Sequence, residues 1–460
     1  MHESQKSRIG VNTIQQEIQT ALEYHRGGQF HRAKSIYLHI LDREPNNPNV
    51  LHLLGVLNHQ SGDNHLAVNL ITQAIRINPR VAIFYNNLGE VFRAMNVIDK
   101  AIACYEMAIK LEANNLEGYS NLGRALMEKG RIDEAISACQ TAIDFKPDFA
   151  DGHWNKALLL LLKGNFAEGW AEFEWRWRCK NPPLPRKNFS QPLWKGSDPT
   201  GRALLLYAEQ GFGDTIQFVR YAPLAAKRGA RVIVECQPEL KSLLQGVEGV
   251  EVLLTAGEPL PPFDLQAPLL SLPLAFNTTI HNIPDHAPYI NTNPSLVEAW
   301  RTKLACEHCF KVGLVWAGKT MRSLSLSAFA PLGAMRGVRF YSLQKGKEAE
   351  EVKNPPPGMD LVDVSKDIKD FSDTAALIAN LDLVISIDTA VVHLAGALDK
   401  PVWTLLPFAP DWRWMLGRED SPWYPTMRLF RQQATRDWVI VIRRVAEELQ
   451  RLSGKKKFAE

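Results

Sequence analysis

Few cysteines and no long apolar run are the first features of this sequence. Its 460 residues include six cysteines, too scattered for a disulfide framework, which favours reduced thiols. Cys306 and Cys309 form one C-x-x-C pair, but a zinc site would need a second pair. No stretch approaches the roughly 18 apolar residues of a membrane span, and the amino terminus lacks the apolar core of a signal peptide. We expect a cytoplasmic protein with no membrane span and no metal.

A strong excess of one charge is also missing. The chain has 53 basic and 50 acidic residues, which gives a formal net charge of +3. Because nucleic acids and anionic membranes attract strongly basic surfaces, this balance argues against both as partners. The length and the 45% hydrophobic content are sufficient for about three domains, each with its own core.

A period of 34 residues runs through the first part of the chain. Turn-forming residues recur at this interval, namely Gly28, Gly62, Asn96, Gly130 and Gly164. A second series is small enough to let two helices cross, namely Ala21, Gly55, Gly89, Gly123 and Ala157. The interval is that of the tetratricopeptide repeat. We therefore expect a helical solenoid over residues 1–180, with five units that begin near residues 14, 48, 82, 116 and 150.

The stacking of repeats has a functional consequence. One helical pair cannot bury its apolar face alone, so stacked pairs share a core and form a curved groove. Such grooves usually bind a protein or a peptide, although this array can also simply brace the rest of the chain. The fifth unit is rich in aromatic residues that we interpret as the seam to the next domain, namely Trp154, Trp170, Phe173, Trp175 and Trp177. A Pro-rich segment, 181–186, then opens a linker that we place at 181–200.

Beyond residue 200, short apolar runs alternate with helical stretches. The first set of predicted strands covers 203–207, 231–235, 250–254 and 263–268. The second set covers 311–316, 339–343, 361–364, 383–387 and 402–406. Strands that are apolar on both faces and alternate with helices indicate parallel sheets covered by helices. We expect two Rossmann-like lobes, at 201–300 and 301–460, with ligands at the carboxyl ends of the strands.

The loop after the first strand, 208–214, has two possible interpretations. Its glycines resemble a dinucleotide-binding fingerprint, but Ile216 replaces the third glycine and Asp214 lies where a pyrophosphate would rest. Gly211 and Gly213, next to Gln210, instead suit a tight turn that leaves room for a substrate. Asp214 can cap the helix that follows, or it can act as a general base toward an acceptor hydroxyl. The sequence leaves both roles open.

The fourth strand of the second set leads into a loop at 387–393. Small residues at a helix start expose backbone amides, which with the helix dipole form an anion site. Thr389 and His393 are four residues apart and so share one helical face. Together with the amides they can hold a diphosphate, although a histidine on a helix can equally be a core residue.

Two motifs resemble those of the ADP-heptose:lipopolysaccharide heptosyltransferase superfamily. That family's first loop reads G-x-G-D, as in 211–214, and its donor loop reads D-T-[GA]-x-x-H, as in 388–393. The likeness covers roughly residues 201 to 450 and implies a GT-B fold with an acceptor lobe followed by a nucleotide-sugar lobe. The layout also looks like that of bacterial repeat-bearing glycosyltransferases and of protein O-GlcNAc transferases. The front lobe is shorter than in heptosyltransferases, which argues against lipopolysaccharide as the acceptor.

The resemblance also implies roles for single residues. Asp214 matches the family's proposed base, and the diphosphate-binding loop is matched by Asp388, Thr389, Ala390 and His393. Lys319 and Arg322 are both candidates for the basic residue that stabilises the departing diphosphate. Gln344 lies where the family contacts the nucleoside.

These observations predict a glycosyltransferase that needs no cofactor. The chain has no D-x-D motif, so the usual metal clamp on a nucleotide diphosphate is missing, and helix amides and positive charge must replace it. The loop at 407–414, with Asp411, Trp412, Arg413 and Trp414, can shape the sugar pocket or serve only in packing. A second hypothesis is a repeat scaffold whose GT-B part is not catalytic. A third, a dinucleotide-dependent enzyme, is disfavoured by Ile216 and Asp214.

Overall fold

The computed structural model divides the chain into two compact units, Met1–Leu159 and Leu160–Glu460. The structure describes residues 2–180, 187–305, 309–318, 323–435 and 437–456. The Pro-rich segment of the predicted linker, 181–186, lies outside these residues. The domain limits set from the sequence, at 180, 200 and 300, stay predictions.

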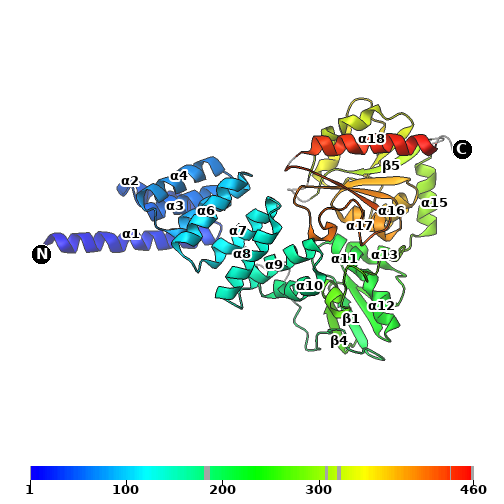
Figure 1. The fold of residues 1–460 in the computed structure, drawn as a ribbon, viewed down its shortest axis with the longest axis horizontal. Helices are drawn as coiled ribbons and strands as arrows, with labels where there is room; N and C mark the ends of the chain where they lie inside the picture. The colour runs from blue at the N-terminus through cyan, green and yellow to red at the C-terminus, as the bar shows by residue number, and fades with distance from the viewer. Residues whose placement is uncertain (1, 181–186, 306–308, 319–322, 436, 457–460) are drawn as a thin grey trace. The chain divides into compact units, whose positions relative to one another are not determined.

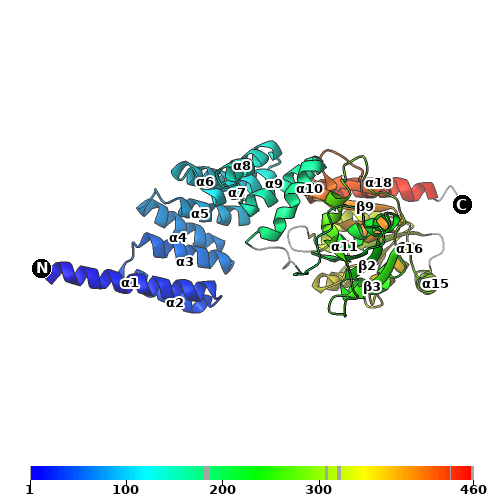
Figure 2. The same ribbon diagram turned by 90° about the horizontal axis from the view of Figure 1, so that it is seen from below.

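The first unit is a stack of antiparallel helix pairs (Figures 1 and 2). Its helices are α1 (His2–Arg26), α2 (Phe30–Arg43), α3 (Pro48–Gln60), α4 (Asn64–Ile77), α5 (Ala82–Ala94), α6 (Ile98–Leu111), α7 (Leu116–Glu128) and α8 (Ile132–Phe145), followed by α9 (Ala150–Lys163) at the unit boundary. From α2 onward the helix starts follow the 34-residue period, which confirms the predicted solenoid, whereas α1 begins at His2 and so extends in front of the start predicted near residue 14.

Glycines at the helix crossings allow the two helices of a pair to touch. A Cβ atom placed on Gly89 would lie 2.5 Å from the ring of Tyr105, and one on Gly55 would lie 2.6 Å from Ile71. Real Cβ atoms do not approach other atoms so closely, so a larger residue would force the helices apart. The small residues of the sequence pattern are therefore packing positions.

Side chains about one period apart link neighbouring units. His25 Nε2 lies 3.0 Å from Gln60 Oε1, and Asn87 Nδ2 lies 2.7 Å from His52 Nε2. Asn155 donates a hydrogen bond of 2.7 Å to Ser120 in the same way. These bonds join the first helix of one repeat to the first helix of the next, so they fix how the repeats stack on one another.

The second unit begins with the end of α9, helix α10 (Phe166–Phe173) and the 3₁₀ helix η1 (Glu174–Arg178). Its first sheet has the parallel strand order β3-β2-β1-β4. The strands are β1 (Ala203–Tyr207), β2 (Arg231–Cys236), β3 (Val250–Thr255) and β4 (Leu265–Pro268). The connecting helices include α11 (Phe212–Phe218), α12 (Ala222–Lys227), α13 (Lys241–Leu244) and α14 (Leu272–Ala275).

The second sheet of this unit has the parallel order β10-β9-β8-β5-β6-β7. Its strands are β5 (Phe310–Val315), β6 (Val338–Ser342), β7 (Leu361–Asp363), β8 (Leu383–Ile387), β9 (Val402–Leu406) and β10 (Met427–Arg431). Helix α18 (Trp438–Lys456) covers one face, while α16 (Phe371–Ala379) and α17 (Ala390–Ala397) cover the other (Figure 1). Helix α15 (Pro294–Lys303) precedes the sheet. The strand order is that of a Rossmann fold, so the predicted pair of Rossmann-like lobes is confirmed.

The structure differs from the sequence-based predictions in several places. The single helix expected after the Asp214 loop is broken into α11, a 3₁₀ turn and α12, and strand β10 was not predicted. Cys309 is disulfide-bonded, so the expectation of reduced thiols is wrong for this residue, whereas Cys104, Cys139, Cys179 and Cys236 carry thiols that form no disulfide. Cys306 lies outside the described residues. No helix within the described ranges is long and apolar enough to cross a membrane.

The helix crossings make a testable prediction for the first unit. The substitution Gly89→Leu should lower the free energy of unfolding by about 1–3 kcal/mol, because the new side chain collides with Tyr105. This loss should exceed the gain of about 1 kcal/mol in helix propensity. Ala94→Leu places the same side chain at an exposed position of the same helix and is the control. Equal unfolding midpoints for the two variants in urea would contradict the assignment of Gly89 as a packing position.

Candidate functional site

The two predicted loops lie where the strand order of each sheet reverses. In the first sheet the strand order reverses between β1 and its neighbour β4. In the second sheet it reverses between β5 and its neighbour β8. Ligands of such folds bind beyond the carboxyl ends of the strands at this reversal. The loop before α11 follows β1, and the loop before α17 follows β8. The topology therefore directs both loops to ligand-binding positions.

Asp214 lies in the first turn of α11, where it folds back onto the start of its own helix. Its Oδ2 accepts a hydrogen bond of 2.8 Å from the Gly211 amide. Gln210 has a left-handed backbone with φ of 63°, which turns the chain from β1 into the helix. The capping role predicted for Asp214 is thus present, and it leaves the other carboxylate oxygen for a second partner.

That second partner is Arg413. Its Nη2 donates to Asp214 Oδ1, its Nη1 donates to Asp411 Oδ1 at 2.8 Å, and its Nε donates to Gln217 Oε1 at 2.7 Å. The guanidinium also lies over the ring of Trp412, 4.2 Å from its centroid. Burial raises the pKa of the Asp214 carboxyl, although Arg413 and the Gly211 amide lower it in part. Arg413 thus holds a buried carboxylate of the first lobe from a loop of the second lobe.

Helices α11 and α17 touch at their first turns. A Cβ atom on Gly213 would lie 2.8 Å from His393 Cδ2 and 3.4 Å from the Cα of Ala390. Glycine at 213 is therefore needed for this close approach, in addition to any role in the turn. The contact brings the loop of Asp214 and the loop of His393 together.

His393 is held by aromatic neighbours. Its Nδ1 lies 2.9 Å from the Tyr424 hydroxyl, and its ring stacks on Trp414 with centroids 5.3 Å apart. Only 5% of the His393 surface is exposed. The bond to Tyr424 fixes the orientation of the ring and engages Nδ1, one of its two nitrogens. The position is compatible with both the core and the ligand-binding interpretations of this histidine.

Thr389 is the N-cap of α17. Its hydroxyl accepts a hydrogen bond of 3.3 Å from the Val391 amide and lies 3.1 Å from the Ser386 hydroxyl. A Cβ atom on Gly318 would lie 3.2 Å from the Thr389 methyl group, so the loop after β5 runs past the start of α17. Asp388, between β8 and α17, is near enough to Arg413 to raise the pKa of that guanidinium, together with the closer carboxylates of Asp411 and Asp214.

Both atoms of the Gln344 side-chain amide form hydrogen bonds to backbone groups. Its oxygen accepts hydrogen bonds from the amides of Trp316 and Ala317, at 3.1 and 2.9 Å. Its Nε2 donates to the carbonyls of Ala317 and Lys345, at 3.1 and 2.9 Å. These four bonds occupy the capacity of a side-chain amide. Gln344 therefore fixes the loop after β5, and its side chain has no bond to spare for the nucleoside contact that the resemblance implied. Lys319 and Arg322, on the same loop, lie outside the described residues.

Several buried donors beside the site have no partner in the described part of the chain. They are Nε2 of Gln210, Nε2 of Gln217 and Nε1 of Trp414. Buried donors are nearly always paired, because an unpaired one costs about 1–3 kcal/mol. All three belong to residues next to Asp214 or His393.

The segment that follows the repeats, α10 and η1, contacts the loop of Asp214 and the loop of Arg413. Arg176 of η1 is fully buried and forms a two-pronged bond to Glu209, at 2.7 and 3.0 Å, in the loop of Asp214. Burial raises the pKa of the Glu209 carboxyl, and Arg176 opposes this shift. Trp170 of α10 packs edge-on against Trp412, with centroids 5.2 Å apart. The predicted aromatic seam therefore includes contacts to the loop that carries Arg413.

Sequence reasoning missed the role of Arg413 and its partners. The 407–414 loop was singled out for its tryptophans, with packing or a sugar pocket as alternatives. Its position after β9, at the carboxyl edge of the second sheet, was the available signal for Arg413. Gln217 and Tyr424 carried no comparable signal, since their bonds depend on contacts between distant parts of the chain.

Removal of the Arg413 charge makes a pH-dependent prediction. Arg413→Gln should lower the free energy of unfolding by about 3–5 kcal/mol at pH 7, because two carboxylates lose their buried counter-charge. It should also raise the pKa of Asp214 further. The deficit relative to the unsubstituted protein should grow as the pH rises through that protein's Asp214 pKa, and should level off above the pKa in the variant.

Denaturant unfolding across this pH range measures the effect. The control is Arg418→Gln, whose partner Asp420 is largely exposed, and whose loss should cost about 1 kcal/mol or less. A deficit for Arg413→Gln that does not change with pH would rule out the proposed electrostatic origin.

The Arg176 bridge makes a second stability prediction. Arg176→Met leaves the Glu209 carboxylate buried and unpaired, so unfolding of the second unit should become easier by about 3–5 kcal/mol. Adding Glu209→Gln to this variant should recover part of the loss, because it removes the uncompensated charge. Urea titrations of the single and double variants test this. Absence of any recovery would show that Arg176 acts through its packing alone.

Comparisons with known proteins agree with this architecture. Residues 333–415 match the model of glycosyltransferase family 9 (heptosyltransferase). Residues 89–130 and 123–164 match a TPR repeat model, and residues 48–81 match a tetratricopeptide repeat model. Protein FlbA of Caulobacter vibrioides is 27% identical over 318 residues, which cover 62% of this chain and 52% of that protein. The uncharacterized protein ycf37 of Pyropia yezoensis is 31% identical over 78 residues, which cover 17% of this chain and 44% of that protein.

The chain thus spans about half the length of the curated relatives it matches. Similar solved structures include MamA, at 25% identity and a TM-score of 0.31, covering 34% of this chain and 91% of that one. Another is YrrB, described as a TPR protein with an unusual peptide-binding site, at 19% identity and a TM-score of 0.30, covering 35% of this chain and 82% of that one. On the motif and model matches, the chain contains tetratricopeptide repeats and a domain of the glycosyltransferase family 9 (heptosyltransferase) type.

Proposed function

We propose that the second unit transfers a sugar from a nucleotide-diphosphate sugar to an acceptor hydroxyl, without a metal ion. The observation that carries this proposal is the contact between the first turns of α11 and α17, each of which begins at a point where its sheet reverses order. It places Asp214 beside the helix start that suits an anion. The repeats provide a groove for a protein or a peptide.

The donor diphosphate would bind at the start of α17. The amides of the first helical turn point out of the helix end, and the dipole of the helix favours negative charge there. Thr389 and His393 flank this end, and Arg413 brings a buried positive charge to the same neighbourhood. Lys319 or Arg322 would add a further cation. This arrangement replaces the metal clamp that other nucleotide-sugar sites use.

Asp214 would act as the general base. The acceptor hydroxyl oxygen attacks the anomeric carbon while its proton passes to the carboxylate and the bond to the diphosphate oxygen breaks. Asp214 Oδ2 accepts from the Gly211 amide and Oδ1 accepts from Arg413, and each carboxylate oxygen has two lone pairs with which to bind hydrogen-bond donors or the proton. Burial raises the Asp214 pKa, which strengthens the carboxylate as a base. A positioned base of this kind gives roughly 10²- to 10⁴-fold acceleration.

One observation favours the alternative of a repeat scaffold with a non-catalytic GT-B part. Asp214 already has a complete structural role, since it caps α11 and pairs with Arg413 across the two lobes. The transferase is favoured by the position of the two loops, because both lie where the strand order of a sheet reverses and ligands of such folds bind there.

The Asp214→Asn variant separates the two functions. If the carboxylate is the base, transfer should fall by about 10² or more, while the affinity for the nucleotide sugar changes little. The measurements are calorimetry with UDP-, GDP- and ADP-sugars and NAD, followed by a transfer assay with the donor that binds. Asp264→Asn is the control, because Asp264 bonds to the amide of Ala203 at the opposite edge of the same sheet. Binding of NAD, or of nothing, would refute the transferase, and full activity of Asp214→Asn would refute the role of the base.

A further inference from the structure

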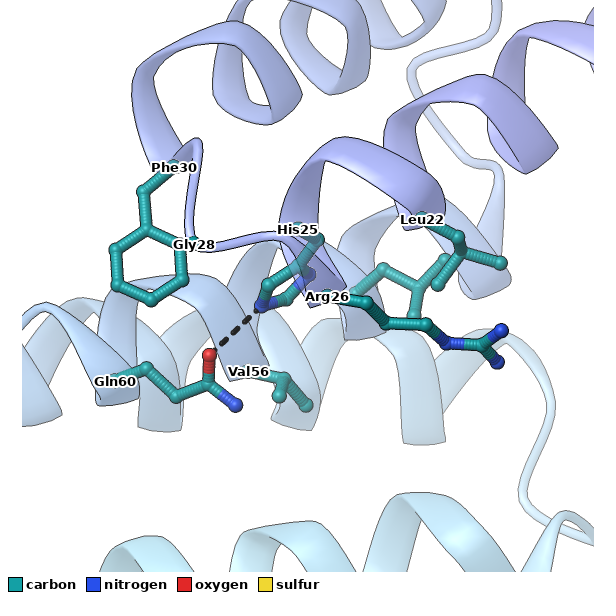
Figure 3. Close-up of a pocket in the computed structure, with 8 residues that line it drawn as sticks. Leu22, His25, Arg26, Gly28, Phe30, Val56 and Gln60 are labelled. Atoms are coloured by element: carbon teal, nitrogen blue, oxygen red, sulfur yellow. Dashed lines mark hydrogen bonds between the residues drawn. The ribbon is translucent and has the colours of Figure 1, made fainter.

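The first two repeats line an open cavity of about 340 Å³. Leu22, His25 and Arg26 of α1 form one wall, and Leu53, Val56 and Gln60 of α3 form another, with Gly28 and Phe30 closing the end. Figure 3 shows the His25–Gln60 bond across the cavity, with Val56 beside it. The walls are mainly aliphatic and aromatic carbon.

The residues that line this cavity can be compared with those at equivalent positions of later repeats. Two periods further on, Leu22 is replaced by Glu90 and Val56 by Arg124. His25 and Gln60 are likewise replaced by Arg93 and Glu128. There, Arg93 pairs with Glu90 at 3.1 Å and with Glu128 at 3.0 Å, while Tyr105 donates to Glu90 at 2.5 Å. The same place in the frame is thus occupied by charged side chains that satisfy one another.

The first interval, between the first and second repeats, keeps a bond between the repeats but lacks the charged side chains found between the third and fourth. The His25–Gln60 bond of 3.0 Å stands where Arg93–Glu128 stands later, and His25 also contacts Tyr37 at 3.4 Å. At the two remaining positions, Leu22 and Val56 present apolar surface to the cavity. Apolar surface left open in this way is stabilised when another apolar group covers it.

A free positive charge borders the apolar walls. Arg26 is exposed, and its guanidinium extends away from the His25–Gln60 pair (Figure 3). Among the side chains that the structure describes, no carboxylate lies within 4.0 Å of it to form an ion pair, unlike Arg43, which pairs with Glu17 at 2.8 Å. A ligand that fills the cavity can therefore gain a charge pair only by bringing its own carboxylate.

From this geometry we propose that the cavity receives a segment of another protein with a large aliphatic or aromatic side chain next to an aspartate or glutamate. The apolar side chain enters between Leu22 and Val56, and the carboxylate pairs with Arg26. This inference rests on the proposed peptide-binding role of the repeats and names the chemistry of the partner. It does not depend on sugar transfer, so either proposal can fail alone.

Selection from a library of random peptides, with the full-length protein as bait, tests the proposal. The enriched peptides should share an apolar residue beside an acidic one, and their affinity is then measured by fluorescence polarisation. The variant Leu22→Glu/Val56→Arg copies the residues of the third interval, so the frame already accommodates them, and it should bind the peptides about tenfold or more weakly. Leu66→Ala, an exposed position outside the cavity, is the control and should leave the affinity unchanged.

Arg26→Glu provides an independent readout if the double variant unfolds. Arg26 is exposed, so the substitution should leave the fold intact while it shifts preference to peptides with lysine or arginine beside the apolar residue. The proposal is overturned if no peptide is enriched, if the enriched peptides lack this pattern, or if neither variant alters binding. Loss of binding in Leu66→Ala to the same degree would also overturn it.

Discussion

The buried guanidinium of Arg413 is the interaction on which the second unit depends. It donates hydrogen bonds to Asp214 in the first lobe, to Asp411 in its own loop and, through Nε, to the side-chain oxygen of Gln217. Without this cation, partial burial of two carboxylates at the junction of two sheets would be too costly. With it, the first turns of α11 and α17 can meet, and the close contact at Gly213 becomes possible. The same cation also brings positive charge to the helix end that suits a diphosphate.

The helix that follows the repeats explains how the Arg413 loop is held. Trp170 packs on Trp412, the residue before Arg413, while Arg176 binds Glu209 on the opposite side of the Asp214 loop. One short segment, α10 with η1, thus supports both partners of the central ion pair. The sequence assigns this segment to the last repeat, yet its side chains complete the core of the second unit. Its pattern satisfies both requirements because a repeat helix has one face for its own hairpin and another free for a neighbour.

The sequence predicted what depends on local pattern and missed what depends on distant contacts. Periodicity placed the repeat helices and nine of the ten strands found in the described residues, since apolar runs and turn residues are read within a few positions. It also located both loops, because strand ends follow from strand positions. The role of Gln344 could not be predicted, because three of its four side-chain bonds reach a loop 27 or 28 residues earlier in the chain. The pairing of Asp214 with Arg413 spans 199 residues, and no local signal encodes such a contact.

The repeat unit shows that a fixed frame allows different chemistry at equivalent positions. The frame requires small residues at the crossings, such as Gly55 and Gly89, because the helix backbones approach there whatever else the unit contains. It places no such requirement on the helix positions between units, where Arg93 and Glu128 form an ion pair in one interval and His25 and Gln60 a neutral bond in another. Stability is thus secured by the crossings and by polar bonds between neighbouring repeats. The remaining positions of each interval are then free to vary, and this freedom is what allows a repeat array to acquire a binding surface without losing its fold.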